Sequence, residues 1–292
     1  MYTLFLLKSN MKKDKKLEVR KIKTRHSSNM TYWVKNVNSR TTIVMLHGIG
    51  SSSSFATKVG RYETNFNIIS LDLPGGKNGP KYPGLTIQAI AEKVSHFIKH
   101  HVRSRNIIIM GHSLGGAVAA HVANNTRKVD EVIYLSPFTP YLAKTKTYKV
   151  ASNYMTLGDS KKDIAKKALL ATAIKAVAKT FGFTNLGAFT DEESNEFTLL
   201  KNNVYKKSYI AKELLHEYQT VKQPSFFMIS EKDIVVGTEG VNKFAKSLGK
   251  EVIIIEGTDH NPFVSSAKKI VDILNEKYKF EKRLFGRKII EL

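Results

Sequence analysis

The sequence of 292 residues predicts an α/β fold, in which a mostly parallel sheet carries helices on both faces. Short apolar runs alternate with segments of helical spacing, which is the pattern of successive β-α-β units. Turn-forming residues such as Pro74-Gly75-Gly76 close the apolar runs. The chain is long for one domain and short for two. We therefore expect one core domain with an inserted segment.

Six strands are predicted before the regular alternation stops. The first alternates apolar and charged residues, as a half-exposed strand does, and the second reads as its hairpin partner. The four that follow are short continuous apolar runs, which are typical of buried parallel strands. The predicted strands span residues 17–23, 30–37, 42–46, 66–73, 106–110 and 131–135. Helices are predicted between them at 86–102 and 115–124, where apolar residues recur at helical spacing or where small apolar residues dominate.

The segment 138–221 breaks the alternation and reads as helices and loops. Its residues 164–179 predict a helix rich in Ala and Lys, which we expect to be amphipathic. Strand and helix then alternate again, with predicted elements at 225–229, 241–248, 251–255 and 265–278. The expected organisation is a core of residues 17–137 and 222–280, an insertion of 138–221 after the fourth parallel strand, and tails of 1–16 and 281–292.

The formal net charge of +22 is the strongest feature of the composition. The lysines are spread along the chain without aromatic interleaving, which favours a lysine-covered surface over specific nucleic-acid binding. The densest basic stretch, 12–25, is consistent with a solvated strand edge. Weak association with an anionic membrane stays open, because a basic helix such as 164–179 favours anionic surfaces. The absence of cysteine excludes disulfides, thiolate metal sites and a cysteine nucleophile.

The N-terminal residues 1–7 are apolar but end at Lys8, with no preceding basic residue and no small-residue cleavage site after them. This pattern makes a poor signal peptide. No apolar run approaches the length of a membrane span. We expect a cytoplasmic location, and we leave open whether translation starts at Met1 or Met11.

The run Gly111-His112-Ser113-Leu114-Gly115 follows the apolar strand 106–110 and opens a helix. A serine at the tip of such a turn is held in a strained backbone conformation, where side chains two residues away on either side would collide. The same turn places Ser113 at a helix N-terminus, which favours developing negative charge. The pattern predicts a nucleophile, Ser113.

A serine hydroxyl needs a base, and the base needs an orienting acid. His260 follows the strand 251–255, and Asp233 follows the strand 225–229, so both lie at the carboxyl edge of the sheet with Ser113. Glu231 is the rival acid. Asp259 is disfavoured because it adjoins His260 in sequence. We predict Ser113, Asp233 and His260 as the catalytic residues.

The loop after strand 42–46 reads His47-Gly48-Ile49-Gly50, and its glycines let the backbone approach a substrate oxygen closely. An oxyanion needs two backbone N–H donors. We expect them at Ile49 and at Leu114, which follows the nucleophile. His47 and Gly48 are expected at the substrate-binding site, and the alternative for His47 is a purely structural role in bracing the loop.

These motifs together resemble the α/β-hydrolase superfamily, and in particular its serine esterases and lipases. The resemblance runs from about residue 42 to 274, with the segment 138–221 interrupting it. It implies an eight-stranded, mostly parallel sheet with a helical cap inserted after strand six, and no metal or cofactor. Asp72 matches a turn residue of the family and has no expected catalytic role. The run Gly75-Gly76-Lys77 departs from many relatives, which have an aromatic residue or His there.

The predicted function is hydrolysis of carboxylic esters through an acyl-enzyme on Ser113, with a small-molecule ester or a lipid as substrate. Thioesterase, proline iminopeptidase and cofactor-free haloperoxidase chemistry are the alternatives on the same scaffold. A basic binding protein that has lost the chemistry is the alternative from another class. The acyl chain, the natural alcohol and the oligomeric state stay open.

Overall fold

A computed structural model describes residues 18–23, 29–76, 85–158, 160–180, 194–206 and 208–279. The two predicted tails, 1–16 and 281–292, lie outside these ranges. Most of the basic stretch 12–25 lies outside them as well.

The described residues form an eight-stranded sheet with the order β1-β2-β4-β3-β5-β6-β7-β8. The first two strands form an antiparallel hairpin, and β2 also pairs antiparallel with β4. All other neighbours are parallel, which confirms the predicted mostly parallel sheet. The strands are β1 (Glu18–Lys23), β2 (Asn29–Lys35), β3 (Thr41–Leu46), β4 (Asn67–Leu71), β5 (Asn106–His112), β6 (Glu131–Leu135), β7 (Ser225–Ser230) and β8 (Glu251–Ile255).

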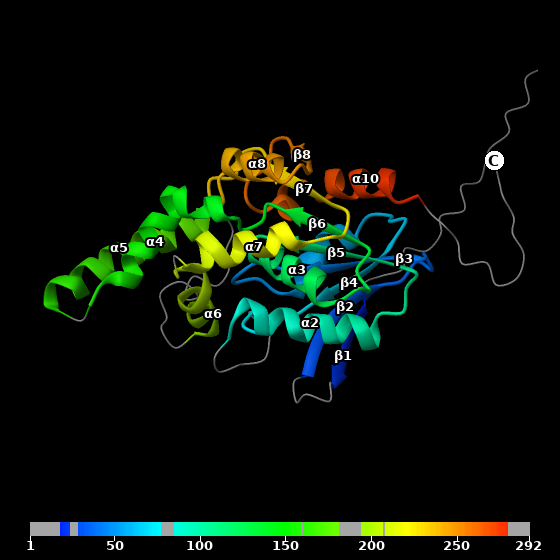
Figure 1. The fold of residues 1–292 in the computed structure, drawn as a ribbon, viewed down its shortest axis with the longest axis horizontal. Coiled ribbons are helices and arrows are strands. Elements are labelled where there is room, and N and C mark those ends of the chain that lie inside the picture. The colour runs from blue at the N-terminus through cyan, green and yellow to red at the C-terminus, as the bar shows by residue number, and fades with distance from the viewer. Residues whose placement is uncertain are drawn as a thin grey trace, which may run out of the picture.

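Two apolar cores hold the sheet between layers of helices (Figure 1). Side chains of a strand alternate between its faces, so Val44 and Leu46 of β3 enter one core while Ile43 and Met45 enter the other. The central strands are buried on both sides, which explains their continuous apolar runs. The first core includes α2 (Ile87–His101), α3 (Leu114–Asn125), α7 (Leu214–Thr220) and α8 (Thr238–Ser247), and the second includes α1 (Ala56–Gly60), α9 (Pro262–Ser265) and α10 (Ala267–Lys277).

Between β6 and β7 the described residues are helical and contain no strand. This helical segment extends away from the sheet, with α5 farthest out in Figure 1. Its elements are a 3-10 helix (Pro140–Lys144), α4 (Lys146–Thr156), α5 (Lys161–Thr180), α6 (Asn195–Leu199), two single π-helical turns (Leu200–Val204 and Tyr209–Glu213) and α7.

The amphipathic pattern predicted for the helix at 164–179 is wrong. In α5, Ile164 is 55% exposed and Leu169 is 73% exposed, whereas Ile174 is buried. At 3.6 residues per turn, Ile164 and Leu169 lie about 140° apart around the axis. The apolar residues therefore do not form one face, and α5 lacks the single apolar stripe that would favour a membrane surface. Among the helices of the described ranges, none is long and apolar enough for a membrane span.

The helix predicted at 265–278 is α10, which begins at Ala267, and the short helix α9, which was not predicted, ends just before it at Ser265. The short helix α1 follows the serine-rich loop after β3 and was not predicted, because five residues are too few to show helical periodicity.

The turn between β5 and α3 consists of Ser113 alone, with φ 56° and ψ −122°. Such a backbone conformation is costly for a residue with a side chain. The neighbouring glycines let the chain pack this tightly. A Cβ on Gly111 would collide with the carbonyl oxygen of Gly115, and a Cβ on Gly115 would lie 2.5 Å from that of Leu46. The predicted reason for both glycines is therefore correct.

We expect Gly111→Ala to lower the free energy of unfolding by about 3 kcal/mol or more, because the added methyl group meets backbone that cannot rotate away. Urea denaturation measures the change. Gly158→Ala is the control, since its Cβ would make only an ordinary contact with the side chain of Asp163, and it should leave stability within about 0.5 kcal/mol. Equal stability of the two variants would contradict this account of the turn.

Candidate active site

Three loops at the carboxyl edge of the sheet bring the predicted site residues together. Ser113 follows β5, Asp233 follows β7, and His260 follows β8. The carboxyl ends of parallel strands share one edge, so residues that are far apart in sequence meet there. All three side chains are buried, each with at most 2% of its surface exposed.

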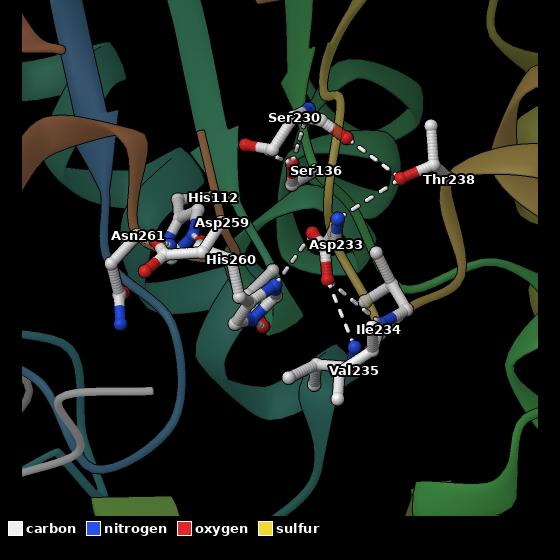
Figure 2. A network of polar contacts seen from close by, with 12 residues as sticks. His112, Ser136, Ser230, Asp233, Ile234, Val235, Thr238, Asp259, His260 and Asn261 are labelled. Carbon is white, nitrogen blue, oxygen red and sulfur yellow. Dashed lines mark hydrogen bonds and ion pairs between the residues drawn. The ribbon is translucent and has the colours of Figure 1, made fainter. Parts of the chain in front are cut away.

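The three side chains form one hydrogen-bonded chain. The His260 Nε2 atom lies 2.9 Å from the Ser113 Oγ atom. The His260 Nδ1 atom lies 2.8 Å from Asp233 Oδ2, and Figure 2 shows this second contact. The other carboxylate oxygen of Asp233 accepts hydrogen bonds from the N–H groups of Val235 and Val236 at 3.0 and 3.1 Å. Both oxygens of the buried carboxylate are thus satisfied, as a buried charge requires.

Burial raises the pKa of Asp233, but the charge of His260 and its hydrogen bond lower it, together with donors at Val236 and Ser136. The second group of effects prevails, so the pKa of Asp233 lies below its ordinary value. An ionised carboxylate only accepts hydrogen bonds, so Nδ1 of His260 must carry the proton that joins them. In the neutral ring, Nε2 then presents its lone pair to the Ser113 hydroxyl.

The two other acids near His260 accept hydrogen bonds from other groups. Glu231 Oε2 accepts the N–H of Gly257 at 2.7 Å, and Asp259 Oδ1 accepts the N–H of Asn261 at 2.9 Å. Both bonds are local to the loop that carries His260. Asp233 therefore has the geometry expected of the orienting acid.

Sequence reasoning missed His112, which lies beside the predicted residues (Figure 2). Its Nε2 atom lies 2.7 Å from the carbonyl oxygen of His260, to which it donates, and the two ring centroids are 5.0 Å apart. Burial, followed by the charge of His260, lowers the pKa of His112 to about 3. His112 is therefore a neutral side chain that fixes the backbone of His260. Its position beside Ser113 was visible in the sequence, but its hydrogen bond to the backbone of His260 was not.

The loop after β3 approaches Ser113 closely. A Cβ on Gly48 would lie 2.9 Å from the Ser113 Cβ, so only glycine fits without displacement. Ile49 follows, and Gly50 turns the chain with φ 65°. On the other side, Leu114 opens α3, and the first N–H groups of a helix have no partner within it. Ile49 and Leu114 thus flank the nucleophile from two sides.

His47 lies behind this loop. Its Nδ1 atom donates to the carbonyl oxygen of Gly48 at 2.7 Å, and its Nε2 atom accepts the N–H of Leu73 at 3.0 Å. Burial lowers the pKa of His47, which keeps the ring neutral, as these two bonds require. The arrangement favours bracing of the loop over direct contact with a substrate. Gly48, in contrast, lines a cavity at Ser113.

Two cavities meet at Ile49. The apolar cavity has a volume of about 250 Å³ and lies between the core and the helical segment. Its apolar walls include Phe138, Leu142, Tyr148, Ile174, Leu200 and Val204. The second, which we call the serine cavity, has a volume of about 320 Å³ and reaches Ser113 itself. Its walls include Ser51, Ser52, Ser54, Thr57, Lys58 and Phe263.

The buried His112 predicts a pH dependence of stability. Unfolding returns its pKa from about 3 to the ordinary 6.5, so the unfolded chain binds more protons between these values. Stability must then fall as the pH falls through this window. We expect His112→Gln, which keeps an N–H donor, to reduce the slope of unfolding free energy against pH by up to about 1.4 kcal/mol per unit.

Urea denaturation at a series of pH values between about 7 and 5 measures this slope. The exposed His216 supplies the matched control, because His216→Gln should leave the slope as it is in the wild type. An unchanged slope in His112→Gln would show that His112 is not a buried neutral ring.

Known proteins resemble this chain along most of its length. A protein of Mycoplasma genitalium with the provisional name esterase/lipase 3 is 29% identical over 252 residues, covering 80% of this chain and 87% of its own. A pimeloyl-[acyl-carrier protein] methyl ester esterase of Pseudoalteromonas atlantica is 23% identical over 264 residues, covering 84% of this chain and 97% of its own.

Among solved structures, an esterase of Exiguobacterium antarcticum has the same fold, with a TM-score of 0.65 and 16% identity over 89% of this chain and 98% of its own. The sequence pattern of the Alpha/beta hydrolase family matches residues 43–273, which include Ser113, Asp233 and His260. With this match over most of its length and a sheet of the same kind, the chain belongs to the alpha/beta hydrolase family.

Proposed function

We propose that the chain is a serine hydrolase that cleaves carboxylic esters through an acyl-enzyme on Ser113. The observation that carries this proposal is the hydrogen-bonded chain from Ser113 through His260 to Asp233. A serine hydroxyl is a weak nucleophile until an adjacent base takes its proton, and the base works only when its tautomer is fixed. Each of these requirements has its residue here, at hydrogen-bonding distance.

In the proposed reaction, His260 Nε2 removes the Ser113 proton while Oγ attacks the ester carbonyl carbon. The negative charge on the carbonyl oxygen is met by the N–H groups of Ile49 and Leu114. The tetrahedral intermediate then expels the alcohol, which receives its proton from His260. Water repeats the sequence on the acyl-enzyme and releases the carboxylic acid. Asp233 stays ionised throughout and stabilises the imidazolium.

We assign residues 138–221 the role of a cap that covers the nucleophile and binds the acyl chain. The apolar cavity supports this role, since it opens beside Ile49 and its walls are supplied by the core and by the helical segment. Its volume of about 250 Å³ lies just below the usual range of small-molecule sites. A hydrocarbon acyl chain of short or medium length fits this space and chemistry.

Esters are favoured over thioesters and amides by the two relatives described above, which carry the names esterase/lipase and methyl ester esterase. These names are statements about the relatives. For this chain they support ester hydrolysis as the first activity to assay, and a panel of thioesters and proline amides with matched acyl groups tests the alternatives.

We expect Ser113→Ala to lower kcat for hydrolysis of 4-nitrophenyl butyrate by about 10⁴-fold or more, because removal of the nucleophile leaves only the oxyanion donors and binding. The rate across 4-nitrophenyl esters should peak at short or medium acyl chains and fall for long ones. The assay follows release of 4-nitrophenol.

The control is Ser247→Ala, an exposed serine on α8, which should hydrolyse the ester at the wild-type rate. Labelling with a fluorophosphonate should occur in this control and in the wild type, and be lost in Ser113→Ala. Full activity of Ser113→Ala would overturn the proposed function.

A further inference from the structure

The serine cavity borders both Ser113 and the loop that carries His260. His260 protonates the leaving oxygen, so the alcohol has to lie against the His260 side of Ser113. Residues just after His260, namely Asn261, Phe263 and Val264, form one wall of the serine cavity. The apolar cavity also borders Ile49, and most of its other walls come from the helical segment. The two cavities could thus hold the two halves of an ester, with the acyl chain in the apolar cavity and the alcohol in the serine cavity.

The serine cavity is suited to a polar and anionic group. Hydroxyl groups line it, and the Lys58 ammonium is the cationic group on its described walls, since burial keeps His112 neutral. No carboxylate lies among the described residues that line it. A half-buried cation without an acid in the same cavity favours an anion brought by a ligand.

Lys58 is not needed to complete its own helix. It lies in the last turn of α1, where a lysine often serves the terminal carbonyl groups. Here the buried Lys35 of β2 donates instead to the carbonyl oxygen of Gly60, the last residue of α1, at 3.1 Å, and to that of Tyr62, just beyond the helix, at 2.5 Å. Lys35 is only 2% exposed, so this contact anchors α1 to the sheet.

The serine-rich loop that precedes α1 is anchored as well. Asp72 accepts the N–H of Ser53 at 2.7 Å, and the hydroxyl groups of Ser52 and Ser54 lie 2.7 Å apart. The hydroxyl-bearing loop and the helix that carries Lys58 are therefore held in place before any ligand binds. Preorganised polar groups of this kind bind a ligand at a smaller entropic cost.

We propose that the serine cavity binds the leaving alcohol of an ester whose alcohol carries an anionic group such as a phosphate, and that Lys58 recognises this charge. The inference rests on the proposed esterase function and specifies its substrate class. The substrate joins a hydrocarbon acyl chain in the apolar cavity to a hydroxyl-rich anionic alcohol in the serine cavity. Lys58 acts in binding and takes no part in proton transfer.

The test compares two esters that share the acyl group and differ in the charge of the alcohol, 1-butyrylglycerol and 1-butyrylglycerol 3-phosphate. We expect the wild type to show kcat/KM about tenfold higher for the phosphorylated ester, as a charge-assisted contact provides. Lys58→Gln should remove this preference by raising KM for the phosphorylated ester, and Lys58→Arg should restore it.

The matched control is Lys246→Gln, which makes the same change in net charge at an exposed position of α8 and should retain the preference. If Lys246→Gln lost the preference for the phosphorylated ester as fully as Lys58→Gln, the effect would belong to the overall charge and the proposal would be overturned. So would hydrolysis of both esters at equal rates, which leaves the esterase function intact. Hydrolysis of neither ester by an enzyme that cleaves 4-nitrophenyl butyrate would overturn this inference alone. Hydrolysis of both esters by Ser113→Ala would overturn the esterase function and this inference with it.

Discussion

The left-handed backbone of Ser113 is the constraint on which the site depends. A single residue turns the chain from β5 into α3, so the hydroxyl group projects from the edge of the sheet and cannot withdraw into it. The turn can form only because Gly111 and Gly115 bring backbone within a distance that a Cβ would not allow. Gly48 extends the same requirement to the neighbouring loop, which places Ile49 beside the nucleophile. The strain at Ser113 is thus balanced by the close packing of its turn against the loop after β3.

The site also depends on the burial of a charged carboxylate, that of Asp233. Asp233 is kept ionised by His260 and by two backbone N–H groups, so the low-dielectric site strengthens the hydrogen bond to the imidazole. His112 holds the backbone of His260 from the opposite side. The histidine is therefore fixed at its ring and at its main chain. This rigidity keeps Nε2 within reach of the Ser113 hydroxyl, as proton transfer requires.

Sequence reasoning reached the parallel sheet and the positions of Ser113, Asp233 and His260, because these depend on strand order and on local turn chemistry. It failed where the outcome depends on tertiary packing. The spacing of Ile164 and Leu169 around α5 could be read from the sequence, but the packing of Ile174 against α4 could not. The bracing role of His47 and the contact of His112 depend on backbone groups from other strands.

The two cavities connect this geometry to the choice of substrate. Their proposed roles depend on the covalent acylation of Ser113. The most direct measurement is rapid acid quenching during turnover of 4-nitrophenyl butyrate, followed by mass spectrometry of the peptide that contains Ser113. The account predicts a butyryl adduct on Ser113 of the wild type during turnover. In a variant with His260 replaced, an excess of activated ester should still acylate Ser113, and the adduct should accumulate because deacylation is slow. An adduct on another residue, or turnover with an unmodified Ser113 peptide throughout, would contradict the account.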